Sequence, residues 1–256
     1  IKHHFQQPLR WAKMPPKKSA SGTSRVYLDV DIDGELEAFE LGKAFVDAND
    51  IKYGLSSKDV LKLGGSELSR LPELFEADFQ WSAKGKALFR PPLQRVVIEL
   101  DEQASPMACQ NFKAFCTGEK GKSKESGRMM HYKGVIFHRI VKGMFMQGGD
   151  FVKGTGAGGE SIFGKPFKDD AGGLKKKHDA AGVVSMSNTG KNSNTCQFFI
   201  TFAPIPKLDR EHVVMGKVVE GLEVIQRVEE ECATDQDGLK PKLPVTMVDC
   251  GILDSS

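Results

Sequence analysis

The strongest constraint on the fold is a series of short apolar runs, each of strand length and separated by glycine-containing turns. Within them Val, Ile, Phe and Met dominate or alternate with polar residues, which is typical of β-strands. The runs are 26–32, 94–100, 135–141, 145–147, 183–187, 197–202, 213–219 and 245–248. So many short strands favour an all-β layer architecture over a helical bundle.

Two isolated helices are predicted among these strands. Ser105 and Pro106 are a favourable N-cap and first position for a helix that ends near Cys116. A second helical pattern covers 222–230. Many short strands with only two helices between them predict a closed antiparallel barrel with helical caps.

The first predicted hairpin is interrupted. Strand 26–32 runs into the turn signal Asp33-Gly34, yet its partner strand begins only at Gln94. Between them lie helical patterns at 36–49, 57–61 and 67–79. We therefore predict three parts: a leader (1–24, disordered or a cloning remnant), a barrel domain (25–34 and 93–253) and a helical insertion within it (35–92). The helical pattern of the insertion, with apolar residues from Leu61 to Trp81, could form a small packed satellite. We expect the insertion to pack against the barrel at the hairpin end; the alternative is a docking surface for an unknown partner.

Composition excludes several classes of function. The formal net charge of +2 is nearly balanced, so no nucleic-acid partner is indicated. No stretch approaches the ~20 apolar residues that cross a bilayer, so we expect no membrane partner and a cytoplasmic or nuclear location. The five cysteines are odd in number and lack a C-x-x-C pair, which disfavours a disulfide framework and a zinc site. Residues 159–165 match a phosphate-binding loop only until Pro166, so we predict no cofactor and no metal.

Strand alternation groups candidate site residues by face. Three segments each place a polar side chain and an aromatic ring on one face: Arg139 with Phe137, Gln147 with Phe145, and Gln197 with Phe199. His138 is assigned to the opposite face of its strand, with Ile136 and Ile140. Alternation alone does not distinguish this pattern from ordinary solvent-facing strands.

Long motifs in a fixed order resemble the cyclophilin family. They are 132–140, 147–151, 158–164, 185–188, 194–200, 208–209, 212–218 and 249–251. The resemblance covers 25–34 and then 94 to about 253. It implies a mainly β fold, a closed eight-stranded antiparallel barrel capped by two helices, to which the small helical insertion is added.

The resemblance also implies a peptidyl-prolyl cis-trans isomerase, which accelerates rotation about X-Pro bonds in peptides and proteins. Arg139 matches the catalytic arginine, which donates to the proline nitrogen in an apolar pocket. The matching substrate-binding positions are Met144, Phe145, Gln147, Ser187, Asn188, Thr189, Gln197, Phe199, Lys207, Leu208 and His212. Proline-containing peptides and proteins are the implied partners. The alternative is a proline-motif binding module or scaffold whose turnover is incidental or lost.

The chain departs from the family pattern at three places. Met144-Phe145 stands where the family usually has Phe-Met, and Ser187 and Thr189 replace the alanines common on either side of Asn188. Lys207 occupies a position where the family often has a tryptophan. Because lysine cannot supply that indole, we expect weak binding of cyclosporin, the family's cyclic-peptide inhibitor.

The segment 118–131 is longer than in the shortest cyclophilins and resembles the divergent-loop subgroup. In that subgroup two cysteines and a glutamate recur together, and Cys116, Cys250 and Glu160 fall at the matching positions. The resemblance implies a reversible redox pair of Cys116 and Cys250. The alternative is two free buried thiols.

Overall fold

The computed structural model describes residues 23–92, 94–235 and 240–253. Most of the predicted leader lies outside the described residues. Its last two positions, Thr23 and Ser24, begin the first strand, because they pair with Asp101 and Leu100 in the register of the first hairpin.

All eight predicted strands form. They are β1 (Thr23–Ile32), β2 (Arg95–Asp101), β3 (Phe137–Val141), β4 (Phe145–Gly148), β5 (Val183–Met186), β6 (Phe198–Thr201), β7 (Val214–Glu220) and β8 (Val245–Leu253). The α-helices are α1 (Glu35–Tyr53), α2 (Gly65–Ala77), α3 (Phe79–Ser82), α4 (Pro106–Thr117) and α5 (Leu222–Cys232). Three 3-10 turns are η1 (Val60–Lys62), η2 (Gly173–Lys175) and η3 (Pro206–Leu208).

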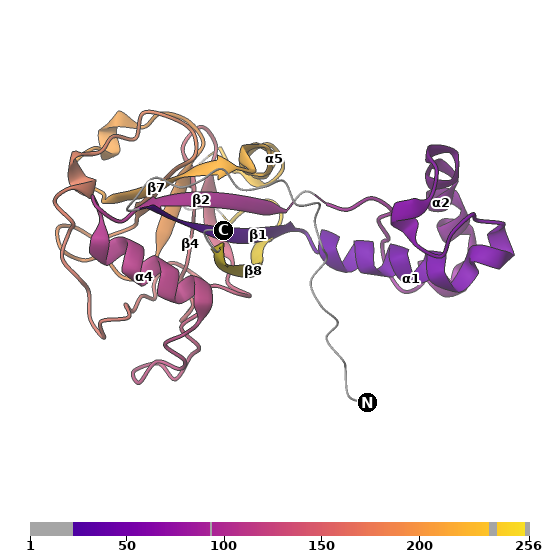
Figure 1. The fold of residues 1–256 in the computed structure, drawn as a ribbon, viewed down its shortest axis with the longest axis horizontal. Helices are drawn as coiled ribbons and strands as arrows, with labels where there is room; N and C mark the ends of the chain where they lie inside the picture. The colour runs from indigo at the N-terminus through magenta and orange to yellow at the C-terminus, as the bar shows by residue number, and fades with distance from the viewer. Residues whose placement is uncertain (1–22, 93, 236–239, 254–256) are drawn as a thin grey trace.

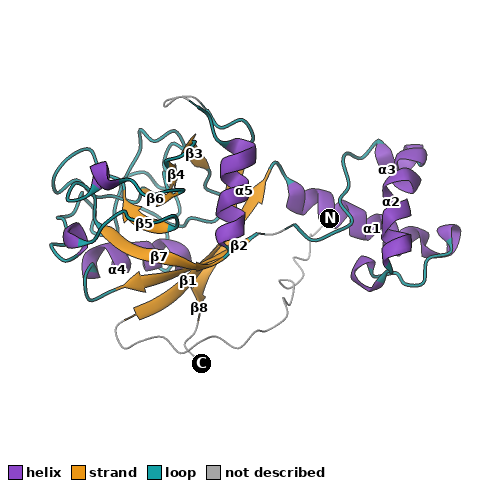
Figure 2. Cartoon of the chain, turned by 90° about the horizontal axis from the view of Figure 1, so that it is seen from above, coloured by secondary structure: helices purple, strands orange, loops and turns teal. Residues whose placement is uncertain are grey.

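The strands form one antiparallel sheet in the order β3-β4-β6-β5-β7-β2-β1-β8, which curls around the core (Figures 1 and 2). Its edges approach each other where the Gly134 amide donates to the Met247 carbonyl (2.7 Å), the Met247 amide donates to the Val135 carbonyl (2.9 Å), and Ile136 bridges Thr246. Among the described residues the edges meet through this short contact rather than a continuous ladder. The mainly β class and the eight antiparallel strands are confirmed; continuous closure of the barrel is not shown.

The two predicted barrel helices cover the sheet and bury their apolar faces in its core. Phe112 and Phe115 of α4 and Val224 and Val228 of α5 are essentially inaccessible and belong to the same cluster as the barrel's inward side chains. In Figure 1, α4 and α5 lie on opposite sides of β1 and β2. Full burial of each such side chain stabilises the fold by roughly 1.5–3 kcal/mol. No helix in the described residues is both long enough and apolar enough to span a bilayer.

The start of α4 differs from the expected cap. Ser105 precedes the helix as predicted, but its hydroxyl donates to the Val214 carbonyl (2.6 Å) and makes no capping bond. The carboxylate of Asp170 instead accepts from the amides of Met107 (3.3 Å) and Ala108 (2.9 Å). The capping acceptor therefore comes from 63 residues along the chain, which no local pattern could indicate.

The segment 35–92 has its own apolar core. Its fully buried members include Phe39, Phe45, Leu71 and Phe75, and the Phe45 ring contacts four other aromatic rings of the same segment. Both views show α1 leading away from the barrel with α2 and α3 at its far end (Figures 1 and 2). The expectation that this segment packs against the barrel is wrong, because its apolar side chains bury one another. The predicted helix at 57–61 is also replaced by the 3-10 turn η1, whose first turn is capped by Asp59.

Polar contacts fix the root of this arm. Asp33 and Gly34 adopt the left-handed conformations expected of a hairpin turn, but α1 follows directly. The Asp31 carboxylate accepts from the Leu36 amide (2.8 Å), and the Arg227 guanidinium of α5 forms a two-pronged ion pair with Glu35. These bonds tie the first turn of α1 to both the sheet and α5.

Candidate active site

Three adjacent strands bring the main predicted site residues together. Arg139 of β3 lies opposite Gln147 of β4, and Gln147 lies opposite Phe199 of β6. The register shifts between Phe137 and Arg139, so His138 forms a bulge. This bulge makes the predicted pairing of Arg139 with Phe137 on one face wrong. Phe137 turns into the core, and Arg139 is half-buried on the outer surface.

The faces predicted for β4 and β6 are confirmed. Phe145 and Phe199 leave the main core and form a separate small cluster, in which their ring centroids lie 5.2 Å apart. Ile205 is the third buried member of this apolar cluster, and Met144 and Leu208 pack against it. Met146, Phe198 and Ile200 point the other way and fill the barrel, as alternation predicts. Ile205 was missed by sequence reasoning; an isolated apolar residue between two prolines carries no periodic signal.

The Arg139 guanidinium lies against this apolar cluster. Its central carbon is 4.8 Å from the centroid of the Phe145 ring, within cation–π range, and its Nη1 donates to Gln147 Oε1 (2.9 Å). On the other side, Arg139 and Gln147 line a cavity of about 740 Å³ together with His138, Gly156 and part of the segment 240–245. Arg139 therefore contacts the apolar cluster and lines an open cavity, where it can donate to a bound group.

A glycine-rich loop supports the polar side of the site. The buried Asp150 carboxylate accepts from the backbone amides of Val152, Lys153, Thr155, Gly156 and Gly158, at 2.8–3.2 Å. Burial raises the pKa of Asp150, but these donors outweigh burial and the net shift is downward. A Cβ on Gly158 would lie 2.3 Å from Asp150 Oδ1, so only glycine fits there. The loop then presents the carbonyls of Gly156 and Gly158 to Gln197 Nε2 (2.8 and 2.5 Å).

A buried polar trio lies beneath the Phe199 ring. His178 is fully buried; its Nδ1 is 3.0 Å from Asp209 Oδ1 and its Nε2 is 2.9 Å from the Ser185 hydroxyl. Burial lowers the pKa of His178 more than Asp209 raises it, so the ring is neutral: Nδ1 donates to Asp209 and Nε2 accepts from Ser185. The same three residue types, hydrogen-bonded in the same order, occur in nucleophilic Ser-His-Asp triads. Here Ser185 is inaccessible, and the imidazole stacks on Phe199 (5.7 Å between centroids), so the trio supports the pocket.

The remaining predicted positions surround this centre. His212 packs edge-on against Phe199 and donates from Nδ1 to the Met186 carbonyl (3.0 Å), while burial lowers its pKa. Asn188 Nδ2 donates to the Glu211 carbonyl (2.8 Å). Thr189 and Lys207 are both exposed, and Lys207 immediately precedes the pocket residue Leu208 in η3.

With this geometry established, comparison with known proteins identifies the family. The model of the cyclophilin type peptidyl-prolyl cis-trans isomerase/CLD family matches residues 89–252. The chain belongs to the cyclophilin family. The matched range contains Arg139, the apolar pocket and the glycine-rich loop. Strand β1 and nearly all of the projecting arm precede it.

Named relatives align over the same cyclophilin domain. "Peptidyl-prolyl cis-trans isomerase cyp11" of Rhizopus delemar is 50% identical over 159 residues, which is 62% of this chain and 46% of that protein. The "NK-tumor recognition protein" of mouse and that of human are each 47% identical over 164 residues, which is 64% of this chain and 11% of each of those proteins. The chain thus spans less than half the length of these relatives.

The two residues implied as a redox pair both contact His131. Cys116 and Cys250 are both buried free thiols, and His131 Nε2 lies 3.2 Å from the Cys116 carbonyl and 3.4 Å from Cys250 Sγ. Burial raises the pKa of Cys116 well above its usual value and that of Cys250 to about 12. Glu160 contacts the 118–131 loop by accepting from the Ser123 hydroxyl. His131 was missed by sequence reasoning as part of this group.

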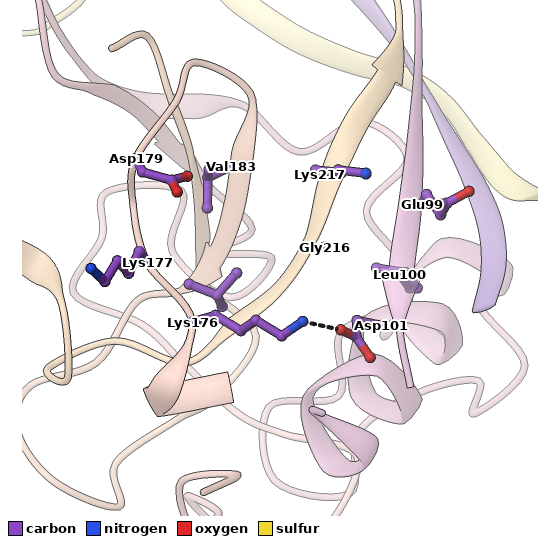
Figure 3. A pocket seen from close by; sticks show the side chains of 10 residues that line it. Glu99, Leu100, Asp101, Lys176, Lys177, Asp179, Val183, Gly216 and Lys217 are labelled. Carbon is purple, nitrogen blue, oxygen red and sulfur yellow. Dashed lines mark ion pairs between the residues drawn. The ribbon is translucent and has the colours of Figure 1, made fainter. Parts of the chain in front are cut away.

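A second cavity, of about 290 Å³, lies on β2, β5 and β7 (Figure 3). Its charged lining is balanced: three lysines (Lys176, Lys177, Lys217) and three acids (Glu99, Asp101, Asp179). Lys176 pairs with Asp101 at 2.7 Å across it. None of the predicted site residues lines this cavity. Within the described residues, no group of three or more His, Cys, Asp or Glu side chains could hold a metal ion.

Proposed function

We propose that this chain is a peptidyl-prolyl cis-trans isomerase that acts on exposed X-Pro segments. The observation that carries the proposal is the position of Arg139, which contacts the apolar cluster at Phe145 and lines an open cavity, with a guanidinium oriented by both Phe145 and Gln147. Membership of the cyclophilin family and the name of the fungal relative support it.

The physical chemistry of the reaction suits these groups. Rotation about an X-Pro bond faces a barrier of about 18–20 kcal/mol because amide resonance is lost in the twisted state, and the uncatalysed exchange takes tens to hundreds of seconds. Reaching ~10³ per second requires roughly 10⁵-fold acceleration, or about 7 kcal/mol. No nucleophile or proton transfer is needed, because no bond is broken.

In the proposed mechanism the proline ring enters the pocket formed by Phe145, Phe199 and Leu208. As the bond twists, the lone pair localises on the proline nitrogen, and Arg139 donates a hydrogen bond to it. That bond is stronger in the twisted state than in either planar state, which is the condition for catalysis. Arginine suits the role because it stays charged and donates in fixed directions. The residues that anchor the substrate backbone hold one side while the other side turns.

The test is a proline-isomerisation assay on a short X-Pro peptide. We expect catalysis by the wild-type chain and a loss of about 10²–10³-fold in turnover for Arg139→Ala, the scale for removing one preorganised donor. The free energy of unfolding should change little, because Arg139 is not in the core. Arg70→Ala, which removes an exposed arginine on α2, serves as the matched control.

Full activity of Arg139→Ala would contradict the mechanism. Peptide binding without catalysis by the wild-type chain would favour the alternative, a module that holds proline-containing segments. The projecting arm is compatible with either outcome, because all the groups of the proposed mechanism lie in the barrel.

A further inference from the structure

We propose that Ser187 is a positioning residue for Arg139, acting through the side-chain amide of Gln147. The inference rests on the proposed function and adds to it a residue that fixes the donor's direction. Ser187 Oγ accepts from Gln147 Nε2 (3.0 Å), and the same Nε2 donates to Gln197 Oε1 (2.9 Å). Gln147 Oε1 accepts from Arg139 Nη1 (2.9 Å).

The direction of this hydrogen-bonded chain is forced at both ends. At one end, the carbonyls of Gly156 and Gly158 can only accept, so the nitrogen of Gln197 must face them. The oxygen of Gln197 then faces Gln147 and requires a donor there. At the other end, the guanidinium of Arg139 can only donate, so the oxygen of Gln147 must face it. Each amide thus has one orientation that satisfies all its neighbours.

Ser187 supplies the last partner in this arrangement. An amide nitrogen carries two N–H groups, and on Gln147 one is taken by Gln197 and the other by Ser187. Gln147 is 8% exposed, so water has little access to an N–H left without a partner. Without the hydroxyl, the Gln147 amide keeps its orientation through Gln197 and Arg139 but loses one of its three partners, so its oxygen is held less firmly against Arg139.

The sequence makes this arrangement a property of this chain rather than of the motif alone. Ser187 stands where the resemblance leads one to expect alanine, whose side chain cannot accept a hydrogen bond. Ser187 lies at the end of β5, directly after Met186, which pairs with Phe198 of β6. The strand pairing therefore places the hydroxyl beside Gln147, and the backbone of Ser187 is held by its own amide, which donates to the Gln197 carbonyl (2.9 Å).

The experiment is a double-mutant cycle of Ser187→Ala and Gln147→Ala, measured by isomerase kinetics. When two residues act as one unit, the effects of substituting them do not add. We expect Ser187→Ala to lower kcat about 3- to 10-fold with KM nearly unchanged, less than the loss of the donor itself. In the Gln147→Ala background, the same substitution should have no further effect. Ser187→Thr keeps the hydroxyl and should restore kcat, and Ser69→Ala, on the exposed surface of α2, should change nothing.

A readout that does not depend on turnover accompanies the kinetics. In NMR spectra, the side-chain amide protons of Gln147 and the Nε–H of Arg139 should lose protection or broaden in Ser187→Ala and recover in Ser187→Thr. An additive cycle, or unchanged kcat and unchanged resonances in Ser187→Ala, would overturn the inference. A wild-type chain without catalysis would overturn the proposed function instead, and the NMR comparison would then decide the inference alone.

Discussion

The barrel and the projecting arm are stabilised in different ways, although they belong to one chain. The arm is a small apolar cluster of mainly aromatic and leucine side chains, fixed at its root by Asp31, Glu35 and Arg227. The barrel combines a much larger apolar core with buried polar networks around Asp150, His178 and Gln147.

The difference teaches which features of a chain carry geometry that is specific enough for chemistry. Apolar contacts are non-directional, so the arm's core fixes its shape without orienting any functional group. The barrel's buried polar groups are directional, and each must find its partner or destabilise the fold. The groups of the proposed mechanism are accordingly concentrated where the directional networks are.

Truncating one core phenylalanine in each region gives the largest expected effect. Phe75 in α2 and Phe112 in α4 are both inaccessible, and replacing either by alanine should cost about 3–5 kcal/mol. The chain's tryptophans are Trp11 and Trp81, so a Trp11→Phe background leaves Trp81 fluorescence as a reporter of the arm. Phe75→Ala should lower the unfolding midpoint seen by Trp81 and leave isomerase turnover intact. Phe112→Ala should lower the denaturant concentration at which turnover is lost and leave the unfolding midpoint seen by Trp81 unchanged.

Each of these two variants is the control for the other, since the replaced residue type and its burial are matched. Coincident loss of Trp81 fluorescence and of turnover in both variants would show that the regions unfold as one unit, which contradicts the separation of the two cores.

The second prediction concerns ligand affinity at the pocket. Lys207→Trp should strengthen cyclosporin binding by about 1–3 kcal/mol, comparable to a buried hydrogen bond together with added aromatic area. Turnover of a short peptide should barely change, because Arg139 and the pocket rings are untouched. Calorimetric titration of both variants measures the difference. Tight binding by the wild-type chain that the substitution leaves unaltered would remove the argument, and Lys84→Trp on the arm is the matched control.

The sequence predicted the barrel's elements well, because strand-length runs and helix starts are local signals. It also placed Phe145, Gln147, Gln197 and Phe199 on the correct faces through simple alternation. It failed at His138, because a bulge depends on the partner strand. The motifs shared with cyclophilins identified the candidate site residues together, but they did not identify the contacts that support those residues.

Those supporting contacts depend on residues far apart in the chain. Asp170 caps α4 and Ser187 bonds Gln147, and each of these contacts spans 40 or more residues of the chain. Ile205 joins Phe145 and Phe199 from outside any predicted strand or helix. The arm was mispredicted for a related reason. Its helical periodicity marks an apolar face, but periodicity does not say whether that face packs on the barrel or on a neighbouring helix of the same arm.

The third prediction uses pH to separate the regions. Burial lowers the pKa of His178, His212 and His138, all in the barrel, whereas the arm contains no histidine. Below the ordinary histidine pKa of about 6.5, the unfolded chain then binds more protons than the folded one, so the barrel's free energy of unfolding decreases as pH falls from there. In the arm, Glu67 and Asp78 have lowered pKa values, through hydrogen bonds from Ser56 and Lys52 respectively, so their contribution is lost only at more acidic pH.

Denaturant unfolding at pH 7 and pH 5 measures this difference. Turnover or NMR should report a lower unfolding midpoint of the barrel at pH 5 than at pH 7. The unfolding midpoint of the arm, reported by Trp81, should stay constant. His178→Gln should reduce the barrel's pH dependence. An equal loss of stability in both regions, or an unchanged slope in His178→Gln, would show that these histidines do not control it.

The smallest expected effect is a response of activity to oxidants. All five cysteines lie in the barrel, so any such response belongs to that region. The resemblance to divergent-loop cyclophilins implies a reversible Cys116–Cys250 pair, and His131 Nε2 lies against both the Cys250 thiol and the backbone carbonyl of Cys116. Oxidation proceeds through the thiolate, however, and a pKa of about 12 for Cys250 leaves roughly 10³-fold less thiolate at pH 7 than an ordinary thiol has. Treatment with peroxide for minutes should therefore leave both thiols free and change turnover less than about two-fold. Prolonged treatment with diamide should form the disulfide, strain the 118–131 loop and lower turnover until a reductant restores it.

Mass spectrometry maps the linkage, and Cys116→Ser gives the baseline that cannot form it. Rapid formation of the pair under peroxide would show that the loop opens far more often than the buried thiols indicate, and a mapped disulfide with turnover equal to Cys116→Ser would show that the pair has no regulatory effect.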